Sequence, residues 1–150
     1  MGANMKTRSR NREAGTALME LALAIFLLLT ALTGVMEFGR AFYFAAEVAN
    51  AARAGVQWAA INPGHPNNLS AMQTAATNDA IDMTNVKATA SEFCECDDGS
   101  SVDCVTGTCA SGTVRTYVRV ITSAPYKTLG DYPWMPNLVT VTARAVLRVD

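Results

Sequence analysis

Histidine is scarce in this sequence of 150 residues. Its one histidine, His65, lies in a turn-like segment, which disfavours catalysis built on a histidine base. The net charge is -1, which argues against a nucleic-acid binder. We find no nucleotide-binding loop, no catalytic triad and no converging set of metal ligands. We therefore expect neither an enzyme nor a protein that holds a cofactor or a metal.

Charge is also sparse, at 17% of residues, whereas hydrophobic residues make up 50%. This balance excludes a disordered chain, and the length suits one domain. The first fifteen residues carry four basic side chains against one acidic one, Glu13. Because basic residues collect on the cytoplasmic flank of membrane segments, residues 1–15 are expected to be a cytoplasmic leader.

A long apolar run follows this basic segment. Within Ala14–Met36 the one charged residue is Glu20. A membrane-spanning helix needs about 20 apolar residues, so residues 16–36 predict a single transmembrane helix in lipid, with the rest of the chain outside the cytoplasm. A cleaved secretory signal peptide is the alternative, but the best cleavage site after the run, at Ala31–Thr33, is poor.

Glu20 needs an explanation, because a carboxylate near the start of a spanning helix costs on the order of 2 to 3 kcal/mol on insertion scales. One reading is that its side chain reaches back to the interface. The other uses Gly15, which precedes Thr16 and closes the basic segment. This order resembles the class III signal of type IV pilins and pseudopilins. The resemblance implies that a membrane aspartyl peptidase cuts between Gly15 and Thr16, and that the new N-terminus is often methylated.

Cleavage would place a new ammonium group at Thr16 on the same helix as the Glu20 carboxylate. In a bundle of such helices, the ammonium group of a neighbour can neutralise that carboxylate in a medium of low dielectric constant. Such a pair is weak evidence for stability but can fix the register of packing. We therefore interpret Glu20 as a register residue for helix assembly.

The helical pattern continues past the apolar run. Residues 37–60 contain no proline, and apolar residues recur there at spacings of three and four. The face they define consists of Phe38, Phe42, Ala45, Ala49, Ala52, Val56 and Ala59. The turn residues of Asn62–Pro66 predict that the helix ends near Ala60. We expect one helix from about Thr16 to Ile61, whose outer half, residues 37–62, supports an outer domain.

Two short motifs on this helix carry a closer resemblance. They are Glu37-Phe38-Gly39-Arg40, at the end of the stretch Gly34–Arg40, and Ala52-Arg53-Ala54-Gly55, at the end of the stretch Ala49–Gly55. With the Gly15–Glu20 signal, they resemble the TadE-like family, the pseudopilins or minor pilins of the tight-adherence (Tad/Flp) type IV pilus system. The similarity is strongest over residues 12–60.

The resemblance implies a bacterial inner-membrane protein, cut by prepilin peptidase, that takes part in assembling or priming a pilus for surface adhesion. The partners it implies are other pilin or pseudopilin subunits and the inner-membrane assembly platform. Its place in the fibre, at the shaft, tip or base, is left open. It also implies a type IV pilin-like α+β fold, in which the long helix carries a small head.

Residues 63–150 are expected to form that head. Residues 67–84 predict a helix, with Ser70–Gln73 as a capping box. Alternating segments at residues 86–91, 114–121 and 139–149 predict a three-stranded antiparallel sheet. We expect its apolar face to pack on the outer half of the long helix, against Phe38, Phe42, Val56 and Trp58.

A cysteine-rich loop at residues 94–109 is expected to staple this small head. Four cysteines in a segment outside the cytoplasm indicate two disulfides. They are Cys94, Cys96, Cys104 and Cys109. Three pairings are possible, and Cys94 with Cys96 is the least favourable. A zinc site is the rival reading, but the paired spacing typical of zinc ligands is absent.

Acidic residues surround these cysteines, and a tyrosine and a tryptophan lie further on. The acidic residues predict a solvated loop, with calcium binding as the alternative. Tyr132 and Trp134 lie in a proline-bearing loop and form either a lid on the core or a contact with a neighbouring subunit. A membrane-tethered binding module that is never processed, using either loop to bind its ligand, remains the alternative to the pilus role.

Overall fold

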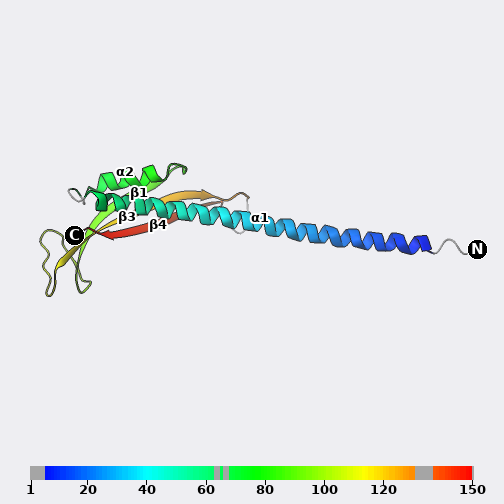
Figure 1. The fold of residues 1–150 in the computed structure, drawn as a ribbon, viewed down its shortest axis with the longest axis horizontal. Helices are drawn as coiled ribbons and strands as arrows, with labels where there is room; N and C mark the ends of the chain where they lie inside the picture. Colours follow the sequence, from blue (N-terminus) through cyan, green and yellow to red (C-terminus); the bar gives the residue numbers. More distant parts are fainter. Residues whose placement is uncertain (1–5, 63–64, 66–67, 131–136, 150) are drawn as a thin grey trace, which may run out of the picture. The chain divides into compact units, whose positions relative to one another are not determined.

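A computed structural model describes residues 6–62, 65, 68–130 and 137–149, with side chains from Gly15 onward. The chain divides into two compact units, Met1–Arg40 and Ala41–Asp150. The ribbon in Figure 1 shows two helices and an antiparallel sheet. The expected α+β class is confirmed.

Helix α1 spans Lys6–Ile61 and enters both units. It continues without a break because no proline interrupts residues 6–61. It ends one residue after the predicted Ala60. There the backbone amide of Asn62 donates to the carbonyl of Trp58 at 3.1 Å, and its side-chain amide donates to the same oxygen at 2.8 Å. Asn62 thus satisfies a carbonyl that the helix end would leave without a partner.

Helix α2 spans Leu69–Asp79. The capping box expected at Ser70 is wrong, because the N-cap is Asn68, whose side chain accepts a hydrogen bond from the Ala71 amide at 3.1 Å. Asparagine is as good an N-cap as serine, and its position two residues earlier starts the helix there. One face of α2 is apolar and turned inward, with Met72 and Ala76 fully buried.

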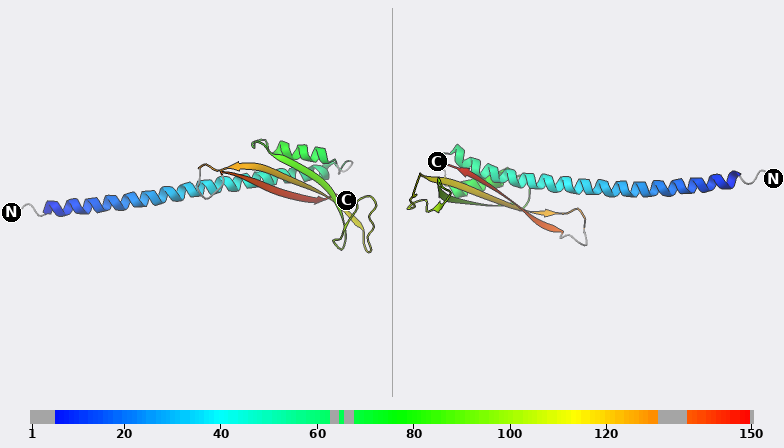
Figure 2. Two further views of the ribbon diagram at one scale, coloured as in Figure 1. Left: turned by 180° about the vertical axis from the view of Figure 1, so that it is seen from behind. Right: turned by 90° about the horizontal axis from the view of Figure 1, so that it is seen from below.

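The sheet has four strands rather than the expected three. They are β1 (Lys87–Cys96), β2 (Ser101–Val102), β3 (Val114–Lys127) and β4 (Leu138–Arg148), in the order β2-β1-β3-β4 with every pair antiparallel (Figure 2). Strand β2 has two residues, too few for an alternating pattern to reveal. Strand β1 runs on to Cys96, so that Cys94 and Cys96 lie on a strand rather than in a loop.

The inner face of the sheet packs on α2 and on the part of α1 within the second unit. Val118 and Val120 of β3 are fully buried and cluster with Val56 and Met72. Trp58 and the predicted inward-facing residues Ala145, Leu147 and Val149 pack against this cluster. The Thr122 hydroxyl is also buried and donates to the carbonyl of Val48 at 2.6 Å.

The expected burial of Phe38 and Phe42 is wrong, because they are 81% and 80% exposed. The buried stripe of α1 runs instead through small residues and Val48, on a face rotated from the predicted one. Its members are Val48, Ala51, Ala52, Gly55, Val56 and Ala59. Small side chains let the sheet approach the helix closely, so the aromatic residues are left outside.

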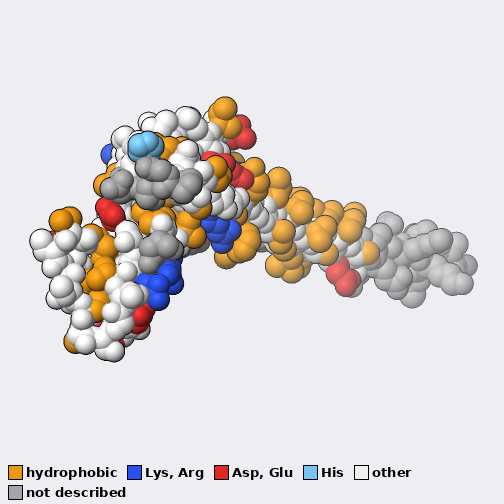
Figure 3. Space-filling model, turned by 60° about the vertical axis from the view of Figure 1, so that its left-hand side comes forward, with side chains coloured by type: hydrophobic (Ala, Val, Ile, Leu, Met, Phe, Trp, Pro, Cys, Tyr) orange, Lys and Arg blue, Asp and Glu red, His pale blue; other side chains and the backbone are white. Residues whose placement is uncertain are grey.

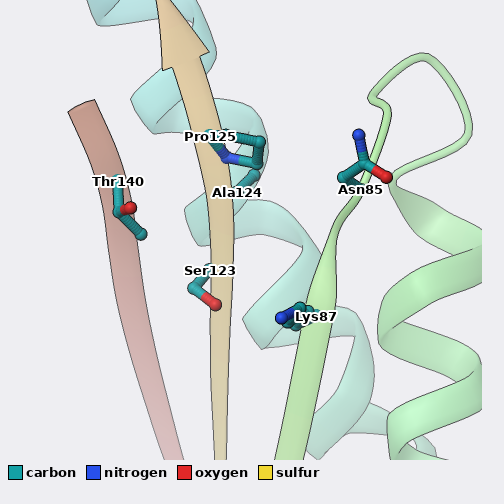
Figure 4. A pocket seen from close by; sticks show the side chains of 6 residues that line it. All are labelled: Asn85, Lys87, Ser123, Ala124, Pro125 and Thr140. Atoms are coloured by element: carbon teal, nitrogen blue, oxygen red, sulfur yellow. The ribbon is translucent and has the colours of Figure 1, made fainter. Parts of the chain in front are cut away.

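Proline is tolerated inside β3 because of where β1 begins. Pro125 is aligned with Thr140 on β4, whereas the pairing with β1 starts at Ser123. The missing amide proton of Pro125 therefore interrupts no pair with β1. Beside it lies a shallow pocket of about 400 Å³, lined by Asn85, Lys87, Ser123, Ala124, Pro125 and Thr140 (Figure 4).

Candidate processing and assembly segment

The three residues of the predicted peptidase signal lie on α1 within the first unit. Gly15, Thr16 and Glu20 are all exposed. No heavy atom lies within 4 Å of the position that a Cβ at Gly15 would take. Thr16 and Glu20 are four residues apart and so share one face of the helix. The signal is thus sterically open to a peptidase and to neighbouring helices.

The apolar part of α1 carries its hydrophobic side chains outward. Its large hydrophobic side chains between Leu18 and Met36 are between 47% and 70% exposed. The segment Gly15–Ile61 contains a window with a mean hydropathy of 2.2, none of which is buried in the protein. Hydrophobic side chains cover the visible face of this helix in Figure 3. By length and composition, this helix can span a membrane.

The two threonines in this apolar segment have hydrogen-bond partners. The Thr30 hydroxyl donates to the Phe26 carbonyl at 2.8 Å, and the Thr33 hydroxyl donates to the Leu29 carbonyl at 3.1 Å. In lipid an unsatisfied hydroxyl would cost several kcal/mol, so these local bonds make both residues compatible with a hydrocarbon environment.

The first family motif, Glu37-Phe38-Gly39-Arg40, lies on the surface of α1. Nη1 of Arg40 is 3.7 Å from Oε2 of Glu37, an ion pair between residues three apart. Phe38 points outward, and no heavy atom lies within 4 Å of a Cβ built on Gly39. These residues therefore leave an aromatic ring and a flat patch on the surface of the helix.

The second motif, Ala52-Arg53-Ala54-Gly55, has a different environment. Ala52 is fully buried, and a Cβ on Gly55 would lie 3.0 Å from both the Met72 carbonyl oxygen and Cγ1 of Val120. Arg53 is exposed, and its Nη1 donates to the Asn50 side chain at 3.5 Å. The small residues of this motif thus hold α1 closely against α2 and β3.

The four cysteines form two disulfides, as expected. Cys94 pairs with Cys104 and Cys96 pairs with Cys109, with Cα–Cα distances of 5.2 and 5.7 Å. Both distances are ordinary for disulfides. Both bonds tie the end of β1 to the segment that leads to β3. The sequence alone did not decide whether Cys94 pairs with Cys104 or with Cys109, because the positions of these two residues depend on the hairpin of β1 and β2.

The carboxylates between the cysteines accept hydrogen bonds within the chain. Asp97 accepts from the Thr113 amide at 3.0 Å and from Nε of Arg115 at 2.8 Å, and together these lower its pKa. Hydrogen bonds from Ser100 lower the pKa of Asp98. Within the described residues, no three metal-binding side chains come together. These aspartates hold the turns of an exposed segment.

A close approach of the backbone explains one glycine in this segment. Gly112 has a φ of +85°, and a Cβ there would collide with the Asp97 carboxylate. Glycine adopts such a φ without strain, so the chain can bring Thr113 and Arg115 to Asp97. The Arg115–Asp97 pair was not predicted, because its partners are eighteen residues apart.

Sequence reasoning also missed a cluster on the outer face of the sheet. The rings of Phe93 and Tyr117 stack with centroids 5.4 Å apart, and the guanidinium of Arg119 lies 4.5 Å from the centroid of Phe93. Polar residues at alternate positions of β3 indicated which side chains point outward. Which residues of β1 lie beside them depends on the register of the two strands, which the sequence does not reveal. Tyr132 and Trp134, the predicted contact residues, lie outside the described residues.

Comparison with protein families gives one match. Residues 15–57 match the sequence model of the family described as TadE-like protein. This confirms the resemblance over the segment that holds the predicted peptidase signal, the apolar helix and both motifs. Searches of curated proteins and of solved structures each gave no significant match.

Proposed function

We propose that this chain, TadE-like over residues 15–57, is a pseudopilin or minor pilin that helps to assemble or prime a Tad-type pilus used in surface adhesion. Prepilin peptidase cuts it between Gly15 and Thr16. The helix that follows holds the protein in the bacterial inner membrane, with its N-terminus in the cytoplasm. Its role is structural rather than catalytic, and its partners are other pilus subunits and the assembly platform.

One observation carries this proposal. The family match covers an apolar helical segment whose large hydrophobic side chains, between Leu18 and Met36, are all exposed within the described part of the chain. Such a surface is stable in lipid or against other apolar helices, and an assembling pilus subunit passes from the first environment to the second.

The carboxylate of Glu20 provides a specific interaction between helices once the subunit leaves the lipid for the packed helices. Its side chain is exposed on the helix, and no partner for it exists among the described residues. An ammonium group freed at Thr16 of an adjacent subunit would neutralise it in a medium of low dielectric constant. The Glu20 carboxylate would then be neutralised only when the helices pack with Thr16 of one subunit beside Glu20 of another. This would favour packing in a single axial register.

Coexpression with a prepilin peptidase and the pilus machinery tests this role. We expect wild-type protein to lose its first fifteen residues and to appear in the sheared surface fraction. Gly15→Phe should stay uncut because a large side chain blocks the approach to the backbone. Glu20→Ala should be inserted and cut but enter the sheared fraction poorly, and Glu37→Ala serves as a matched loss of a carboxylate outside the apolar run.

Two results would remove the proposal. Normal incorporation of Glu20→Ala would refute the register role. Wild-type protein that remained full length with an active peptidase present would favour the alternative, a membrane-tethered module that is not processed.

A further inference from the structure

The outer face of the sheet carries two arginines that lack acidic partners. Alternation along β3 and β4 places Arg119 and Arg144 on the face opposite the buried Val118 and Val120. Arg119 is aligned with Val146, and Arg144 with Ile121. The two arginines thus occupy diagonal positions on neighbouring strands, and such positions lie about 7 to 8 Å apart. Val146, which is partly exposed, lies directly across from Arg119 and two residues along β4 from Arg144. We call Arg119, Arg144 and Val146 the arginine face.

The positive charge of this face is not neutralised by the described part of the chain. Arg115, at the end of the same face, pairs with Asp97, but neither Arg119 nor Arg144 has a carboxylate within 4.0 Å among described residues. Nε of Arg119 is buried without a hydrogen-bond partner there, while its guanidinium is held against Phe93. Stacking fixes the plane of the group, so less freedom is lost when a carboxylate binds it.

A second surface of the same unit has the opposite charge. Asp79 ends α2, and Asp82 follows three residues later; both are exposed and without ion pairs among the described residues. Between them Ile81 is 84% exposed. We call Asp79, Ile81 and Asp82 the acidic end.

The acidic end is unfavourable in the isolated unit. The C-terminus of a helix carries a partial negative charge, so an aspartate there is repelled and a cation is favoured. The last turn of α2 has no basic residue to compensate. A cationic surface from outside would relieve this repulsion, which makes the acidic end a natural counterpart for arginines.

The two surfaces match each other in charge and in apolar content. Each presents two like charges with an exposed aliphatic side chain beside them. We infer that the arginine face of one copy of this chain docks on the acidic end of a second copy. Arg119 and Arg144 would bind the two carboxylates, and Val146 would meet Ile81. This contact lies in the unit Ala41–Asp150 and needs neither processing nor a pilus.

Mixing of charge-reversed variants tests this contact directly. Full-length protein in detergent micelles would be labelled at its N-terminus with a donor or an acceptor dye, and energy transfer between copies would be titrated. Arg144→Glu and Asp82→Arg should each weaken association with itself about tenfold, the size of effect expected for one close charge pair. Mixed together, the two variants should recover most of the wild-type energy transfer, because the reversed face then meets the reversed end.

The controls separate this contact from association through the apolar helix. Glu92→Arg makes the same charge change as Asp82→Arg at an exposed site outside both surfaces, and it should associate like wild type. Raising the salt from about 0.05 M to about 0.5 M should weaken wild-type association. Unchanged association of Arg144→Glu, or no recovery on mixing, would overturn the inference. So would a wild-type protein that does not associate.

Discussion

The units Met1–Arg40 and Ala41–Asp150 differ in how far their large hydrophobic side chains are exposed. Between Leu18 and Met36 the large hydrophobic side chains are at least 47% exposed, whereas Val48, Met72, Val118 and Val120 are fully buried. The second unit therefore obtains its stability from its own core and disulfides. Among its described residues, the first unit has no buried hydrophobic side chain, so its surface suits an apolar environment such as lipid or other apolar helices.

The largest effect is expected when charges are placed in the exposed apolar helix of the first unit. Leu27→Arg with Leu28→Arg places two charges at the centre of the apolar helix, each costing about 2.5 to 3.5 kcal/mol on insertion scales. We expect the protein to leave the membrane fraction in flotation experiments, while the second unit stays folded. Ile61→Arg with Val105→Arg, at sites 78% and 92% exposed, should remain membrane-bound. Retention of the Leu27 and Leu28 variant would contradict a spanning helix.

Two methionines test whether the buried core stabilises the second unit. Met72 is fully buried, whereas Met36 is 59% exposed. Met72→Ala should lower the free energy of unfolding by about 2 to 5 kcal/mol through lost burial and a cavity. Met36→Ala should leave it unchanged. Chemical denaturation followed by tryptophan fluorescence measures both, and equal effects would show that the assigned core is wrong.

A pair of glycines sharpens the comparison within the family motifs. A Cβ at Gly55 would crowd Met72 and Val120, whereas one at Gly39 meets nothing. Overpacking costs about 1 to 3 kcal/mol, and alanine returns about 1 kcal/mol of helix propensity. Gly55→Ala should therefore lower the Tm by a few degrees, and Gly39→Ala should not. A higher Tm for Gly55→Ala would mean that the helix and sheet are not in close contact there.

The smallest effect concerns pH. Hydrogen bonds lower the pKa of Asp97, Asp98 and Asp103 in the folded chain. Their contribution to stability is therefore complete above the unfolded value near 4, and it is lost as the pH falls through the lowered folded values. We expect the Tm to fall between about pH 5 and pH 2, and to fall less in Asp97→Asn. An equal decline in both proteins would remove Asp97 from this account.

The sequence allowed prediction of features that are local. A run of apolar residues and the absence of proline predicted α1 from Thr16 onward, and the turn residues after Ile61 predicted its end, whereas its start at Lys6 was not predicted. Alternation over eleven residues revealed β4 and its inward side.

Features that depend on tertiary contacts could not be predicted. Phe38 and Phe42 share a periodic stripe with Val56, but periodicity does not say which stripe a sheet will cover, and close packing selected the small residues. The disulfide pairing and the Arg115–Asp97 ion pair depend on the register of β1 and β3. The arginine face likewise appears only when β3 and β4 are aligned.

The intact mass of the protein, extracted from the membrane of the cell that makes it, tests the account most directly. The account predicts a chain that starts at Thr16, with or without a methyl group, and that keeps its apolar helix. A chain that still starts at Met1, or one cut beyond Thr33 and released from the membrane, would contradict it.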